Sequence, residues 1–76
     1  MTLLNKMTPG QKARVVGFTQ DSPLVRRLRE LGIGPGKSVT CVCRAPLRDP
    51  LMFEIGACRL SLRRTDASLV TVELED

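Results

Sequence analysis

The chain contains no histidine, tryptophan or tyrosine, and its only aromatic residues are Phe18 and Phe53. Without histidine, the commonest general base and metal ligand is missing. The acidic residues are scattered and form no pair suited to acid–base catalysis, and no base is available to activate the serines. Gly32, Gly34 and Gly36 alternate around a proline and do not make a phosphate-binding loop. These absences argue against an enzyme.

Long apolar runs are absent too. No stretch approaches the roughly 20 residues that cross a bilayer, and the N-terminal residues lack the apolar segment of a signal peptide. A chain of 76 residues has material for one hydrophobic core. We therefore expect residues 1–76 to form one cytoplasmic domain that does not span a membrane.

Cysteine occurs in an odd number, as Cys41, Cys43 and Cys58, whereas a secreted disulfide scaffold normally has an even number. Reduced thiols are therefore expected. A structural zinc site needs four nitrogen or sulfur ligands, typically in paired units, so the three cysteines are only weak candidates for a metal site. We expect Cys41 and Cys58 to face the core as small hydrophobes, with Cys43 the most reachable thiol, and we expect no cofactor.

Turn signals divide the chain into short segments rich in β-branched residues. They lie at Pro9 and Gly10 and at residues 34–36, 46–50 and 56–57. Between them, alternation of apolar and polar residues predicts strands at residues 12–18, 38–45, 51–55, 58–63 and 69–74. The Pro-Gly turns before the first two strands look like one arrangement used twice.

Residues that share one face are predicted in three of these strands, and in the fourth strand that face is the inward one. In the second strand they are Val39, Cys41 and Cys43; in the fourth, Cys58, Leu60 and Leu62; and in the fifth, Val70, Val72 and Leu74. Residues 65–67 are typical of a single helical turn, with Thr65 as its cap. In the first strand, adjacent Val15 and Val16 leave the buried face undecided.

Residues 21–32 have the pattern of a short helix with both caps. Ser22 suits the N-cap, and Pro23 suits the first helical position. Gly32 can adopt the left-handed conformation after the helix, which would place Ile33 over Leu28. An apolar stripe runs at i, i+4 and i+7, formed by Leu24, Leu28 and Leu31.

Five short strands with one helix after the first cannot make two stacked sheets. A strongly bent sheet that closes on itself fits better, since closure also removes exposed strand edges. We therefore predict a mainly β fold, namely a small SH3-like five-stranded barrel with one short α-helix after its first strand.

The net charge is +4, with basic residues concentrated at residues 26–29 and 59–64 and an acidic C-terminus. This asymmetry suits either an anionic partner or simple solvation. Specific nucleic-acid binding is disfavoured because exposed aromatic residues for base stacking are lacking. A protein partner is favoured, and the residues predicted to contact it are Arg26, Arg27, Arg29, Leu47, Arg48 and Asp49. Leu47 is either an exposed anchor or a plug beneath its loop.

Several motifs together resemble the FeoA family, the small cytoplasmic accessory proteins of bacterial ferrous-iron uptake. They are Leu-x-x-Leu-Gly-Ile-x-Pro-Gly at residues 28–36, Ala-Pro-Leu-x-Asp-Pro at residues 45–50, and the segments 58–63 and 70–73. The likeness extends over residues 9–74. It implies an SH3-like barrel that binds the cytoplasmic GTPase region of the membrane iron transporter FeoB and modulates uptake, without itself binding iron or hydrolysing nucleotide.

Two alternatives stay open. The same barrel forms the C-terminal domain of iron-dependent repressors of the diphtheria-toxin-repressor type, so the chain could instead be a detached regulatory domain or a small basic barrel that binds nucleic acid. The three cysteines are not part of the family pattern, and they leave room for a redox role or a weak homodimer.

Overall fold

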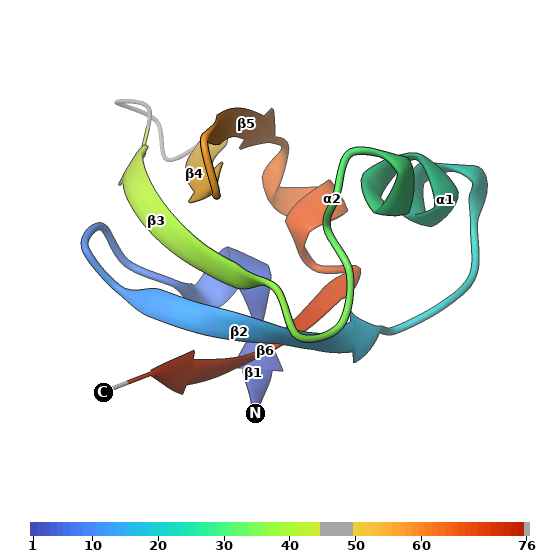
Figure 1. Cartoon of the computed structure of the whole chain (residues 1–76), viewed down its shortest axis with the longest axis horizontal. Helices are drawn as coiled ribbons and strands as arrows, with labels where there is room; N and C mark the ends of the chain where they lie inside the picture. Colours follow the sequence, from blue (N-terminus) through green and yellow to red (C-terminus); the bar gives the residue numbers. More distant parts are fainter. Residues whose placement is uncertain (45–49, 76) are drawn as a thin grey trace.

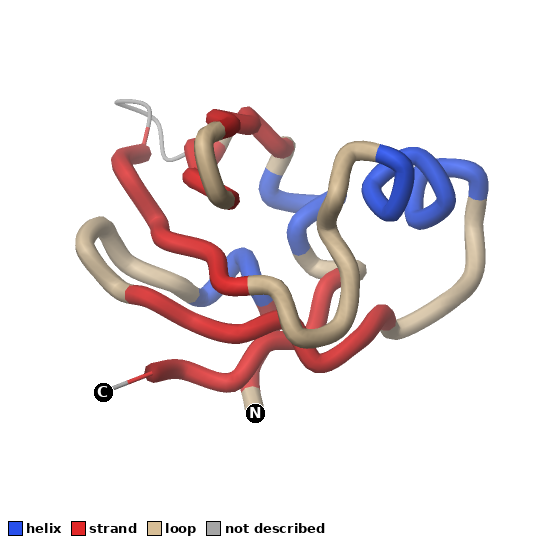
Figure 2. The backbone as a smooth tube through the Cα atoms, in the orientation of Figure 1, coloured by secondary structure: helices blue, strands red, loops and turns tan. Residues whose placement is uncertain are grey.

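The computed structural model describes residues 1–44 and 50–75, with Cys43 and Arg44 described by their backbone alone. The elements in chain order are β1 (Thr2–Leu3), the 3-10 turn η1 (Leu4–Lys6), β2 (Lys12–Phe18), α1 (Pro23–Glu30), β3 (Ser38–Arg44), β4 (Leu51–Ile55), β5 (Cys58–Leu62), α2 (Arg64–Ala67) and β6 (Val70–Glu75). Figure 1 shows a strongly curved sheet with α1 standing beside one end of it, and Figure 2 shows how little of the chain is helical.

The six strands form one antiparallel sheet in the order β1-β6-β2-β3-β4-β5. The predicted mainly β fold is confirmed, with one strand more than the five expected. The additional strand, β1, is two residues long and pairs with Thr71 and Val72; a segment so short has no periodicity from which to predict it. Within the described residues β1 and β5 do not pair, so these two strands are the edges of an incompletely closed barrel.

The two Pro-Gly turns are indeed one arrangement used twice. In each, the N–H of the residue after the glycine donates to the carbonyl of the residue before the proline, at 3.0 and 3.1 Å. Gly10 and Gly36 have φ values of +90° and +89°, as a type II turn requires. Gly10 N–H then donates to the Cys41 carbonyl and Gly36 N–H to the Val15 carbonyl, both at 2.8 Å. Because β2 and β3 are antiparallel, the turns close opposite ends of one ladder.

A bulge in β2 decides which of its two valines is buried. Val15 pairs with Val72, and Gly17 pairs with Thr71, so Val16 is the additional residue. The side chain of Val15 is therefore directed into the core, at 2% exposure, while Val16 is 42% exposed. The bulge depends on the pairing with β6, a strand more than fifty residues away in sequence, and so was not evident from the local pattern.

The capping residues of α1 behave as predicted. Ser22 Oγ accepts a hydrogen bond from Val25 N–H at 3.2 Å. Gly32 has a φ of +97°, and Ile33 N–H donates to the Leu28 carbonyl at 2.9 Å. This last bond is the 6→1 bond of a Schellman motif, which brings the residue after the glycine onto the last turn of the helix.

The predicted apolar stripe of α1 is partly wrong. Val25 and Leu28 are fully buried and Leu24 is half-buried, but Leu31 is 53% exposed. The Schellman motif explains the difference, since Ile33 takes the position over Leu28 and leaves Leu31 outside. The cap of α2 also differs from the prediction: the helix begins at Arg64, and its N-cap makes no side-chain hydrogen bond.

The core is aliphatic and contains one phenylalanine. Its members come from η1, α1, α2, the segments between them and every strand except β1; they are Leu4, Met7, Ala13, Val15, Leu28, Ile33, Val39, Cys41, Leu51, Phe53, Leu62, Ala67, Val70 and Val72. Leu74 was expected to join Val70 and Val72 but is 45% exposed, because β6 continues past its last pair with β1 at Val72. In the described part of the chain, no helix is long and apolar enough to cross a membrane.

Candidate protein-binding surface

The cysteines do not converge. Cys41 is fully buried, and its Sγ lies 4.0 Å from the Met7 carbonyl oxygen, as expected for a small hydrophobe with a weak donor. Cys58 was expected to face inward but is exposed, because it directly follows the β4–β5 turn, where the core has already ended. The Cys43 side chain lies outside the described residues. Over the described ranges, no three His, Cys, Asp or Glu residues are grouped as a metal site requires.

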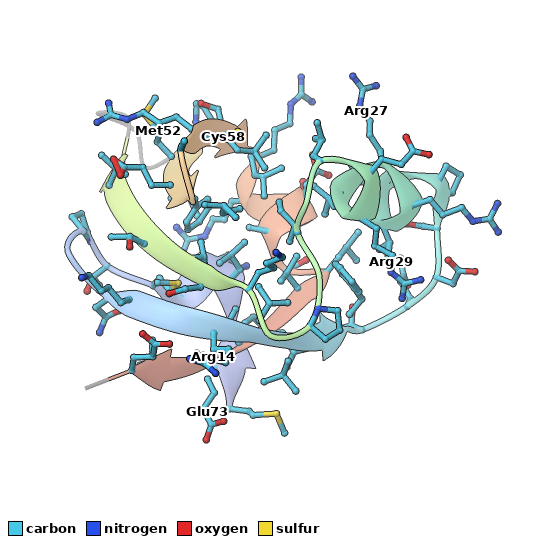
Figure 3. The ribbon with its side chains drawn as sticks, in the orientation of Figure 1. Arg14, Arg27, Arg29, Met52, Cys58 and Glu73 are labelled. Atoms are coloured by element: carbon cyan, nitrogen blue, oxygen red, sulfur yellow. The ribbon has the colours of Figure 1, made fainter. Side chains whose placement is uncertain are left out.

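Helix α1 carries the three predicted contact arginines on its exposed side, Arg26, Arg27 and Arg29. Arg26 Nη2 lies 3.5 Å from Asp21 Oδ2, with both side chains about 70% exposed, and such a pair contributes little. The Arg29 guanidinium lies over the Phe18 ring, 5.1 Å from its centroid, and so helps hold α1 against β2. Arg27 extends away from the body of the molecule (Figure 3) and forms no ion pair with a described residue.

An apolar groove begins where α1 ends. We call it the Leu31 groove; the residues lining it are Leu31, Ile33, Ile55, Cys58, Arg59 and Leu60. Its volume is about 180 Å³, below the roughly 300 Å³ at which pockets for small organic ligands begin. A second hollow adjoins it, sharing Leu31 and Ile55 and adding Lys37. The second hollow has a volume of about 340 Å³, so the groove by itself is sized for one side chain of another polypeptide and the two hollows together have room for more than one.

Cations border this groove. Lys37 is exposed, and Arg59 Nη2 lies 3.1 Å from Glu54 Oε2 with its side chain 65% exposed. Apolar surface with a charged rim is the usual anatomy of a protein-binding site. Leu31 directly follows α1, and Arg27 lies four residues before it, one helical turn away, so Arg27 and the groove are neighbours on the surface.

The other half of the predicted contact set, Leu47, Arg48 and Asp49, lies outside the described residues.

Sequence reasoning missed the groove because it assigned Leu31 to the core. One signal was present: when the residue after a C-terminal glycine is apolar, as Ile33 is, it takes the contact with the last turn. The apolar residue just before the glycine, here Leu31, is then not needed for the contact with the last turn of the helix.

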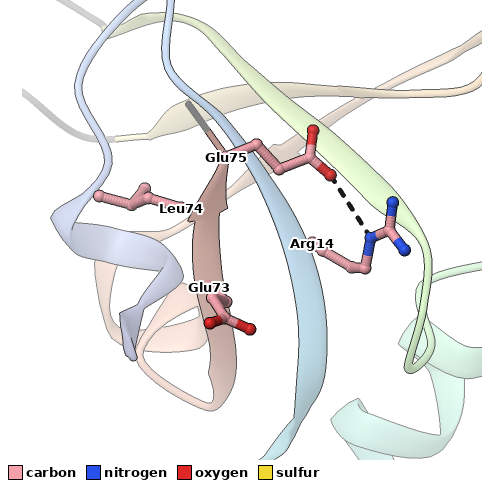
Figure 4. Close-up of a pocket in the computed structure, with 4 residues that line it drawn as sticks. All are labelled: Arg14, Glu73, Leu74 and Glu75. Atoms are coloured by element: carbon pink, nitrogen blue, oxygen red, sulfur yellow. Dashed lines mark hydrogen bonds and ion pairs between the residues drawn. The ribbon is translucent and has the colours of Figure 1, made fainter.

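A second surface of note lies at the C-terminal end of β6. Arg14 Nε and Glu75 Oε1 are 3.4 Å apart, and together with Glu73 and Leu74 they line a shallow, open hollow. Figure 4 shows Leu74 extending from the side of β6 opposite to the Arg14–Glu75 pair. An aliphatic side chain thus stands exposed between two exposed carboxylates.

Known proteins resemble this chain over nearly its whole length. The model of the FeoA domain matches residues 2–74. A fusion of Fe(2+) transport protein A with the Fe(2+) transporter FeoB, from Porphyromonas gingivalis, is 38% identical over 71 residues, which are 93% of this chain but only 8% of that relative.

Two solved structures show the same fold. An FeoA-like protein from Clostridium acetobutylicum has a TM-score of 0.88 at 29% identity, with 96% of this chain and 85% of that chain covered. FeoA from Stenotrophomonas maltophilia, described as an SH3 domain protein and solved in complex with zinc, has a TM-score of 0.85 at 30% identity, covering 96% and 91%. On the family match and these likenesses, the chain belongs to the FeoA family of ferrous iron transport and has its SH3-like fold.

Proposed function

We propose that this chain is a cytoplasmic, non-enzymatic accessory protein of bacterial ferrous iron transport. In this proposal residues 1–76 act as one domain, bind the cytoplasmic GTPase region of a FeoB-type transporter at the inner membrane, and modulate uptake. In this proposal the chain itself carries no cofactor.

The observation that carries the proposal is the Porphyromonas gingivalis relative, in which transport protein A and FeoB are one polypeptide. Fusion holds two parts at a high effective concentration, which is useful when the parts act on one another. The relative thus supports an association that separate chains must achieve through an interface.

The arginines of α1 are the proposed contact surface. Arg27 projects into solvent, and the counterion of Arg26 is itself exposed, so neither charge is strongly neutralised. Exposed charges of one sign speed encounter with an oppositely charged partner and make its affinity depend on salt. We therefore expect an acidic patch on the transporter to meet α1.

The test is titration calorimetry with the isolated cytoplasmic region of the transporter from the same genome. Arg27→Glu is expected to weaken binding about tenfold or more, because a like charge then faces the acidic patch. The thermal melt should hardly change, since exposed charges contribute under about 1 kcal/mol to folding. Lys6→Glu on η1 is the matched control, with the same charge change away from α1, and should bind as the wild type does.

Absence of wild-type binding at about 50 µM would contradict the proposal. If salt-sensitive RNA binding were found instead, the alternative of a basic nucleic-acid-binding barrel would replace it. Equal loss with Arg27→Glu and Lys6→Glu would leave transporter binding in place but remove α1 as its surface.

A further inference from the structure

We propose that the chain associates with itself head to tail. The C-terminal residues 73–75 of one copy add to the free edge of β5 in the next copy, and Leu74 enters the Leu31 groove. The inference is independent of the proposed function, because it concerns two copies of this chain and no transporter. Complementary charge and matching side-chain alternation on the two surfaces carry it.

The Leu31 groove lies on one face of the β4–β5 hairpin, because Ile55 pairs directly with Cys58 and both residues line it. Cys58, Arg59 and Leu60 are consecutive, and all three line the groove. Successive side chains of a strand point to opposite faces, so Cys58 and Leu60 share the face of the groove, which extends to Arg59 at the strand between them. Within the described residues β5 pairs with β4 alone. Its other side is available to an added strand.

The end of β6 has the complementary form. β1 pairs only with Thr71 and Val72, so on that side residues 73–75 have no neighbouring strand in the described part of the chain. Glu73, Leu74 and Glu75 are all exposed. They thus present a short open edge on which an aliphatic side chain alternates with two carboxylates.

The two alternations fit one another. Side chains of neighbouring strands in a sheet point to the same two faces. If residues 73–75 pair with β5 so that Leu74 lies on the same face as Leu60, then Glu73 and Glu75 lie on the opposite face, which is the face of Arg59. Leu74 then enters an apolar groove, and the carboxylates meet a cation. The present partners of these groups, Glu54 for Arg59 and Arg14 for Glu75, are surface pairs, which exchange at little cost.

The two surfaces cannot meet within one molecule. Cys58 at the groove and Glu73 on β6 lie at opposite ends of the side-chain view in Figure 3. The contact is therefore between copies and joins unlike surfaces, so one end copy of an open chain retains an unused groove and the other an unused tail, unless a ring closes.

The test is sedimentation of the full chain under reducing conditions, from about 10 µM to about 1 mM, a range that reaches weak association. The wild type should show a rising average mass. Leu74→Glu and Leu31→Glu should each weaken association at least about tenfold, through loss of a buried leucine. Val16→Glu is the matched control, since Val16 is an exposed aliphatic residue on β2, outside both surfaces, and should associate like the wild type.

Mixing the two defective variants distinguishes head-to-tail contact from other modes. Leu31→Glu retains an intact tail and Leu74→Glu an intact groove, so together they should form one-to-one pairs and nothing larger. A wild type that stays monomeric to about 1 mM overturns the proposal. It is equally overturned if Leu74→Glu associates normally, or if the mixture of variants fails to pair while the wild type associates.

Discussion

The corner formed by α1 and the residues after it contrasts with the hairpin edge at β5. At the corner, Ser22 and Gly32 make the contacts that their residue types favour, and the helix begins and ends as predicted. At β5 the apolar alternation was the most regular in the chain, yet Cys58 is exposed and Leu60 only half-buried. A helix cap is satisfied by backbone within a few residues, whereas burial at a sheet edge depends on whether another strand or helix covers it.

The largest expected effect tests which leucine of the corner supports the core. Leu28→Ala should lower the free energy of unfolding by roughly 2–4 kcal/mol, because Leu28 is 1% exposed. Leu31→Ala should change it by under about 0.5 kcal/mol, as at ordinary surface positions. Urea denaturation of both variants measures the difference. Equal losses would mean that Leu31 belongs to the core after all.

A smaller effect tests whether the corner is specified by its backbone. Gly32→Ala should cost about 1–2 kcal/mol, because a left-handed φ strains any residue with a Cβ. A Cβ at Gly32 or at Gly34 meets no atom within 4 Å, but only Gly32 has a positive φ. Gly34→Ala is thus the matched control and should be neutral or slightly stabilising. Equal costs for the two variants in denaturation would mean that the positive φ of Gly32 does not specify the corner.

The smallest expected effect tests whether the β4–β5 hairpin is exposed at Cys58. Cys58→Ser should change the free energy of unfolding by under about 0.5 kcal/mol. In the native wild type, iodoacetamide should alkylate Cys58 rapidly and leave Cys41 unmodified, since only the former is exposed. Peptide mapping by mass spectrometry identifies each site. Protection of Cys58 equal to that of Cys41 in dilute solution would show that the hairpin end is covered.

Prediction succeeded where neighbours in sequence decide the structure and failed where distant segments do. Both Pro-Gly turns and both caps of α1 follow from local residue types. The burial of Val15 over Val16 follows from the pairing of β2 with β6, and the exposure of Leu74 follows from where β1 stops. The arginines of α1 were recognised as surface charge, but the groove beside them joins Leu31 to the β4–β5 hairpin, and no local pattern connects those segments.

The amino-acid sequence by itself determined the mainly β class, the helix with its caps, the paired turns and the resemblance to FeoA, because each rests on residue types at short fixed spacings. Only the tertiary structure decided that the barrel has a sixth strand, that Leu31 and Cys58 are exposed, and that a groove with a cationic rim opens at the end of α1. The physical reason is that exposure depends on all the elements packed around a residue, and these come together only when the chain is folded.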